Sequence, residues 1–334
     1  MSFGRIILLF LLFVSACSGI DPVSIKMGKA ESLVASNPDS ALKVMASIPM
    51  EQVNTPALKA NFILLYVQIL ERNNLPLVGE SYMEEAVAYF SRYGNGEQKM
   101  LSAFYLGKLY AQDGNLYGAM EQYVLAEAAY RELPESSLTK SYPFWNNIMA
   151  RLNIGKGDIY LQRLNYAAAL KMYGMAAASL ADERANPLLM EVNGKMGDAY
   201  RSEGDFREAL DSYDAARDLA EENGRGKELL RFLTASEGVN FSLGHPSKQV
   251  LAELDSIYAV YCNGKPPVGD YLLLSRLYLD SGNLTKARFY AKEYERLNSD
   301  IPDLQRSRLY SLLVSIESAR ADYKAALSYE RRYN

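Results

Sequence analysis

Histidine and cysteine are nearly absent from this chain, which holds one histidine and two cysteines among 334 residues. The histidine, His245, lies in the turn-like stretch SLGHPSK, and one imidazole cannot build a histidine-rich metal site or a proton relay. No paired CxxC, EF-hand spacing, complete phosphate-binding loop or nucleophile elbow is present. The sequence therefore predicts no metal site, no cofactor and no enzyme.

A basic surface is lacking as well. The formal net charge is −4, whereas a protein that binds nucleic acid needs a basic face. After Cys17 no apolar run is long enough to cross a bilayer as a helix. Hydrophobic residues at 49% and charged residues at 23% are instead typical of a folded globular chain, and no nucleic-acid partner is expected.

The one long apolar run lies at the N-terminus. Arg5 precedes the nine apolar residues IILLFLLFV, residues 6–14, which are too few for a stable membrane-spanning helix but suit a signal-peptide core. The run ends in VSAC, which resembles the bacterial lipobox, where the cysteine is lipidated and everything before it is removed. The resemblance implies a signal peptide over residues 1–16, a lipid anchor at Cys17 and a tether over residues 17–27. An ordinary secretory signal cut near Ala16 is the alternative.

A ladder of small and aromatic residues occurs three times along the chain. Its copies begin at Gly107, Gly157 and Gly197, so they are 50 and 40 residues apart. Repetition at this scale indicates stacked structural repeats. The most complete copy consists of Gly197, Tyr200, Gly204, Phe206, Ala209, Tyr213 and Ala216.

Each copy of the ladder has the pattern of two helices joined by a tight turn. Gly204 is placed to end one helix and Asp205 to cap the next. Nearer the N-terminus, Asn37 followed by Pro38 predicts a helix start. About eight helix pairs are expected from residue 22 to the end of the chain.

The ladder resembles the tetratricopeptide repeat (TPR). This resemblance implies an all-α fold, a right-handed α-solenoid, with divergent helix pairs over residues 28–96, three well-formed repeats over 97–222 and degenerate repeats over 223–334. Two features depart from the family. The spacing exceeds the family period of about 34 residues, which predicts extended linkers such as ELPESSLTKSYPFW, and no polar capping helix follows DYKAALSYERRYN, which suggests a shortened form of a longer protein.

The acidic residues of the ladder have a simpler explanation than catalysis. Asp211, Asp214, Asp218 and Glu222 recur at helical spacing opposite the packing residues, interleaved with arginines. They are therefore predicted to form a solvated helix face.

Stacked repeats of this kind expose a concave groove built by the first helix of each pair. The family's carboxylate-binding asparagines are replaced by Lys108, Asp158 and Asp198, so that clamp is not predicted. The family's groove positions, carried over to this sequence, give a set of mixed charged and apolar residues, which suits an extended peptide or a partner helix. The set is Phe104, Lys108, Gln112, Arg151, Ile154, Asp158, Leu161, Gln162, Asp198 and Arg201.

These patterns predict a lipid-anchored scaffold of the cell envelope that binds a protein or peptide in its groove. It would serve as the sensing part of a longer regulator or as an assembly factor, at the outer membrane and facing the periplasm. The alternative is a glycan-capture lipoprotein of an outer-membrane uptake system, using exposed members of the 25 tyrosines. The sequence leaves the membrane leaflet and the oligomeric state open.

Overall fold

The computed structural model describes residues 21–136, 142–244, 249–298 and 301–333, and it contains helices and no strand within them. The chain divides into two compact units, Met1–Ile159 (unit 1) and Tyr160–Asn334 (unit 2), and the division falls inside the predicted segment 97–222. In chain order the described residues form 16 α-helices, that is, eight consecutive pairs, as predicted. His245 and Cys17 lie outside the described residues.

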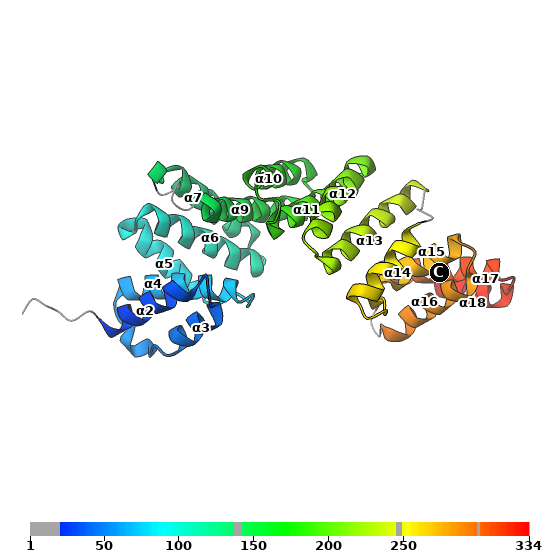
Figure 1. Ribbon diagram of the computed structural model, residues 1–334, viewed down its shortest axis with the longest axis horizontal. Coiled ribbons are helices and arrows are strands. Elements are labelled where there is room, and N and C mark those ends of the chain that lie inside the picture. Colours follow the sequence, from blue (N-terminus) through cyan, green and yellow to red (C-terminus); the bar gives the residue numbers. More distant parts are fainter. Residues whose placement is uncertain (1–20, 137–141, 245–248, 299–300, 334) are drawn as a thin grey trace, which may run out of the picture. The chain divides into compact units, whose positions relative to one another are not determined.

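Unit 1 stacks helix pairs in chain order, shown from dark blue to teal in Figure 1. Its apolar interior includes the fully buried side chains Met83, Phe90, Met100, Phe104 and Leu152. The elements of unit 1 are α2 (Pro22–Leu33), α3 (Pro38–Ala46), the 3-10 helix η2 (Met50–Gln52), α4 (Pro56–Arg72), α5 (Glu80–Tyr93), α6 (Gly96–Gln112), α7 (Leu116–Arg131) and most of α9 (Tyr142–Gln162).

Unit 2 repeats the same plan of helix pairs, shown from green to red in Figure 1. Its elements are α10 (Tyr166–Ser179), α11 (Pro187–Glu203), α12 (Phe206–Glu222), α13 (Gly226–Leu243), α14 (Val250–Tyr261), the 3-10 helix η3 (Val268–Asp270), α15 (Tyr271–Asp280), α16 (Leu284–Leu297), α17 (Asp303–Ala319) and α18 (Tyr323–Tyr333). The protein is therefore all-α and belongs to the helical-repeat class that the ladder predicted.

The ladder residues hold each pair together as expected. The ring of Tyr123 lies against Gly107, where an added Cβ would come within 2.7 Å of ring atom Cδ1, and Tyr213 lies in the same way against Gly197, at 2.6 Å. Both tyrosines are buried. Glycine is required at these positions because any side chain would occupy the space of the aromatic ring.

Two of the helix ends predicted from the sequence, at Asn37 and Gly204, are found in the structure, and the side-chain cap predicted at Asp205 is not. Asn37 accepts a hydrogen bond from the Ser40 backbone N–H at 3.0 Å with Pro38 at the first helical position, and Gly204 ends α11 in the left-handed region at φ 98°. Asp205 occupies the N-cap position of α12, but its side chain accepts no capping hydrogen bond. Its backbone carbonyl accepts the first helical bond, from the Ala209 N–H, at 3.0 Å.

Two predicted connecting segments contain helix. The expected tether over residues 17–27 overlaps α2, because Asp21 caps that helix and Val23 and Met27 bury their side chains. The segment ELPESSLTKSYPFW was expected to be an extended linker, but α9 begins at Tyr142 and Trp145 packs in the core of unit 1. Apolar burial thus extends both helices beyond the boundaries that the repeat pattern suggested.

The acidic face of α12 is solvated as predicted. Asp211, Asp214, Asp218 and Glu222 are all exposed. Arg217 bridges Asp214 at 3.2 Å and Glu253 of α14 at 3.0 Å. The stripe is a charged surface and contains no cluster of carboxylates aimed at one point.

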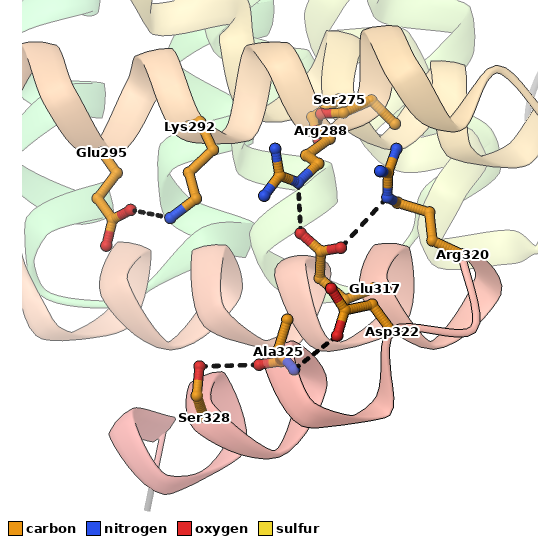
Figure 2. Close-up of polar contacts among 10 residues, drawn as sticks. Ser275, Arg288, Lys292, Glu295, Glu317, Arg320, Asp322, Ala325 and Ser328 are labelled. Carbon is orange, nitrogen blue, oxygen red and sulfur yellow. Dashed lines mark hydrogen bonds and ion pairs between the residues drawn. The ribbon is translucent and has the colours of Figure 1, made fainter.

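A buried carboxylate joins the last helix pairs of unit 2. The side chain of Glu317 on α17 is 1% exposed and lies between Arg288 of α16, with an Nε to Oε1 distance of 2.6 Å, and Arg320, with an Nε to Oε2 distance of 3.3 Å (Figure 2). The turn that follows is closed by the Asp322 backbone N–H, which donates to the Glu317 carbonyl at 2.9 Å. Glu317 therefore ties α16 to the α17–α18 turn.

The close approach of Gly197 to Tyr213 gives a test with a built-in control. Gly197→Ala is expected to lower the free energy of unfolding by about 1–2 kcal/mol, because overpacking a buried site costs more than the gain in helix propensity. Gly174 lies inside α10, and apart from its own helix backbone no atom lies within 4 Å of the place that an added Cβ would take. Gly174→Ala is therefore expected to stabilise by about 0.5–1 kcal/mol. Denaturant unfolding followed by circular dichroism measures both, and shifts of the same sign would contradict this packing account.

Candidate binding groove

Two adjoining pockets lie along the first helices of the pairs in unit 1. Each has a volume of about 440 Å³, and Gln68 of α4 lines both. The first, called the amide pocket, is lined by Ser24, Met27, Gly28, Glu31, Leu58, Asn61, Leu64, Leu65, Gln68, Asn95, Glu97, Gln98 and Leu101. The second, called the charged pocket, is lined by Val34, Gln68, Glu71, Arg72, Asn74, Tyr105, Phe144, Asn147, Ile148 and Arg151.

The charged pocket is organised around Glu71 of α4. Its Oε2 accepts a hydrogen bond from the Tyr105 hydroxyl at 2.9 Å, and its Oε1 forms ion pairs with Lys108 and with Arg151, the latter at 3.3 Å. These partners come from α6 and α9, so one carboxylate joins three successive helix pairs. The ammonium of Lys108 also lies 5.7 Å from the centre of the Phe104 ring.

The electrostatics of this cluster follow from burial and from its two cations. Burial alone raises the pKa of the Glu71 carboxyl, but Lys108, Arg151 and the hydrogen bonds outweigh it, so this pKa lies below its usual range. Burial, and then the charge of Glu71, raise the pKa of the Tyr105 hydroxyl well above its usual value. At neutral pH Glu71 is therefore ionised and Tyr105 remains a hydrogen-bond donor.

The amide pocket presents side chains that both donate and accept hydrogen bonds. Asn95 and Gln98 form a reciprocal capping box at the start of α6, with bonds of 2.9 Å and 3.0 Å. Gln98 also donates to the Asn61 side-chain oxygen at 2.9 Å. Gln68, at the junction of the two pockets, forms no side-chain hydrogen bond with the described part of the chain.

Some of the groove residues predicted in unit 1 are accessible, and others are buried in the core. Lys108 and Arg151 meet at Glu71, and Gln112 is exposed and donates to the Leu77 carbonyl at 3.0 Å. Phe104 and Ile154 are buried in the core, because the neighbouring helices cover them, so their side chains do not reach a ligand. Asp158 is half-buried.

The groove residues predicted in unit 2 centre on Asp198 of α11. Its Oδ1 accepts hydrogen bonds from the Tyr213 hydroxyl at 2.7 Å and from Arg201 at 3.2 Å, and its Oδ2 lies 3.6 Å from Arg231. Leu161 is half-buried and Gln162 is exposed. Asp198 and Arg201 are thus brought together, as one ion pair on the surface of this unit.

Sequence reasoning missed the contribution of α4. Asn61, Gln68 and Arg72 are separated by seven and four residues within the largely apolar stretch ALKANFILLYVQILERN. This spacing places polar side chains along one side of a helix. It was the available signal for the groove in the N-terminal pairs, where the repeat ladder is weak.

Three of the tyrosines at ladder positions lie in the core. Tyr123, Tyr173 and Tyr213 are all buried, so they are not available to stack on a sugar. Within the described residues, no group of three or more histidine, cysteine, aspartate or glutamate side chains is arranged to hold a metal ion.

Comparison with known proteins supports the fold. No family model matches the chain, and no curated protein matches it significantly. Among solved structures, the apo form of RapI has a TM-score of 0.54 at 16% identity, covering 82% of this chain and 96% of RapI. A Rap protein complexed with Competence and Sporulation Factor also has a TM-score of 0.54, at 13% identity, covering 94% and 97% of the two chains. These two likenesses show an all-α helical-repeat solenoid.

A tetratricopeptide repeat protein from Parabacteroides merdae is also similar. Its TM-score is 0.44 at 14% identity, and the match covers 91% of this chain and 98% of that protein.

Proposed function

We propose that this protein is a lipid-anchored scaffold of the cell envelope and that the groove of unit 1 binds an extended peptide segment of a partner protein. The observation that carries the proposal is the pair of adjoining pockets that share Gln68 in their lining. Side-chain amides line one half, and they can donate to and accept from a peptide backbone. Arg72 and Arg151 line the other half, where they suit an acidic residue of the peptide.

The lining comes from α2, α4, α6 and α9, the first helices of four successive pairs. A repeat protein forms an extended binding surface in this way. A Rap protein of the same fold has been solved in complex with the Competence and Sporulation Factor. That complex supports ligand binding as a use of this architecture.

The proposed setting follows from the N-terminal sequence. The apolar run of residues 6–14 and the lipobox-like VSAC favour export and lipidation at Cys17. We place the protein at the outer membrane facing the periplasm, where the scaffold would act as the sensing part of a regulator or as an assembly factor. Within the described part of the chain, no helix is both long and apolar enough to span a membrane.

A photo-crosslinker placed in the groove tests the proposed binding. A photoreactive phenylalanine analogue at Gln68, in the full-length chain in intact envelopes, is expected to capture a specific protein. The same analogue at Tyr117, an exposed position on α7, is the control. Arg72→Glu, which reverses an exposed cation of the charged pocket, is expected to lower the Gln68 yield about tenfold through like-charge repulsion.

The matched control is Arg92→Glu, an exposed charge reversal on α5 outside both pockets. It is expected to leave the yield unchanged. Capture of no specific protein at Gln68, or of the same proteins as at Tyr117, would count decisively against the groove.

A further inference from the structure

A third pocket in unit 1 differs from the groove in being mainly apolar. It has a volume of about 810 Å³ and lies among α3, η2, α4 and α5. It is called the apolar pocket and is lined by Met45, Ala46, Ile48, Met50, Val53, Pro56, Lys59, Ala60, Phe62, Ile63, Tyr66, Val78, Gly79, Tyr82, Glu85 and Tyr89.

Several lining side chains project into solvent. Tyr82 is 60% exposed, Met50 53% and Val78 52%. The rings of Phe62 and Tyr66 stack with their centres 6.0 Å apart on α4. An exposed apolar surface of this kind is unfavourable in water and marks a contact surface. The surface combines a hollow with projecting side chains. It therefore suits a partner surface whose side chains interdigitate with it better than it suits a flat one.

The apolar pocket also carries two opposite charges. Lys59 on α4 and Glu85 on α5 are exposed, and neither forms an ion pair with the described residues. A protein surface that covers the pocket and these two side chains would remove their water. It must therefore offer apolar side chains together with one acid and one base.

The same surface of a second copy meets that requirement. We propose that two copies of this chain associate through their apolar pockets about a two-fold axis. Lys59 of each copy then faces Glu85 of the other, and Tyr82 of each copy enters the pocket of the other. A two-fold contact uses one patch twice, so a patch that carries both a lysine and a glutamate complements itself.

The contact leaves the peptide groove accessible. On α4, Lys59, Ile63 and Tyr66 line the apolar pocket, whereas Asn61 and Gln68 line the groove. With about 3.6 residues per turn, these two sets lie on roughly opposite sides of the helix. The proposed association is therefore independent of the proposed peptide binding.

Charge exchange in the full-length chain tests the association. Two differently tagged copies are co-expressed, each with a photoreactive phenylalanine analogue at Tyr82, and dimers carrying both tags are quantified after irradiation. Lys59→Glu in both copies, or Glu85→Lys in both, places like charges at both contacts and is expected to reduce the dimer yield about tenfold. Lys59→Glu in one tagged copy with Glu85→Lys in the other leaves opposite charges at both contacts of the mixed dimer and is expected to recover the yield. A second rescue is the double variant Lys59→Glu with Glu85→Lys in both copies. It restores both ion pairs with their signs exchanged and is expected to recover the yield.

The controls are Lys265→Glu and Glu203→Lys, exposed charge reversals in unit 2 with no ion pair among the described residues. Both are expected to leave the dimer yield unchanged. Absence of a doubly tagged dimer, single reversals without effect, or crosslinking of Tyr82 to a different protein or to lipid would each overturn the proposal. Crosslinking at Gln68 provides a separate readout, so failure of the dimer and failure of the peptide groove are distinguishable.

Discussion

Replacing Arg288 and Arg320 together by alanine is expected to lower the free energy of unfolding of unit 2 by about 3 kcal/mol at pH 7. The double change leaves the carboxylate of Glu317 buried, 1% exposed, and without either cation that now contacts it (Figure 2). Stranding one member of a buried ion pair costs about 3–5 kcal/mol.

A penalty that comes from the stranded carboxylate can be distinguished from one that comes from losing the packing contacts of the two arginines. If the penalty comes from the stranded carboxylate, adding Glu317→Leu to the double variant is expected to recover most of the lost stability, because an apolar side chain tolerates burial.

The chain offers an internal reference for this measurement. Its single tryptophan, Trp145, is buried in unit 1, so tryptophan fluorescence follows unit 1 while circular dichroism follows all helices. Arg296→Ala, which removes one partner of an exposed pair with Glu293, is the matched control and is expected to leave the denaturation midpoint in place. A double variant as stable as this control would show that Glu317 needs no counter-charge.

The helix pairs could be predicted because their packing rules are local. Gly197 and Tyr213 are 16 residues apart and meet within one pair, so their spacing carries the information that positions them. The same holds for Gly107 and Tyr123. The start of α9 was missed because burial of Trp145 depends on the surrounding core, which no local pattern records.

The groove was only partly predictable for a related reason. The family pattern selected Lys108 and Arg151, but it did not indicate that Glu71 joins them. Glu71 comes from a pair without the ladder, and its ion pairs span 37 and 80 residues of sequence. The pattern also selected Phe104 and Ile154 by register alone, and the depth of the surrounding helices decides that they are buried.

Cys17→Ser is expected to move the protein from the membrane fraction to the soluble fraction almost completely. Serine cannot accept the acyl chains that the lipobox resemblance implies. Each buried methylene contributes about 0.8 kcal/mol to membrane binding, and stable anchoring takes more than one chain. The remaining apolar run of residues 6–14 is shorter than the roughly 20 residues of a stable membrane helix.

Metabolic labelling with an alkyne fatty acid makes the lipid itself visible and separates lipidation from other causes of membrane retention. The chain with its native sequence is expected to carry the label, and Cys17→Ser to lose it. Cys262→Ser is the matched control because Cys262 is the only other cysteine, and this variant is expected to stay labelled and bound to the membrane. Labelling that survives Cys17→Ser, or a labelled chain that fractionates as soluble protein, would exclude a lipid anchor at Cys17. Loss of the label together with release from the membrane places the anchor there, because a serine differs from a cysteine at this position only in the atom that is acylated.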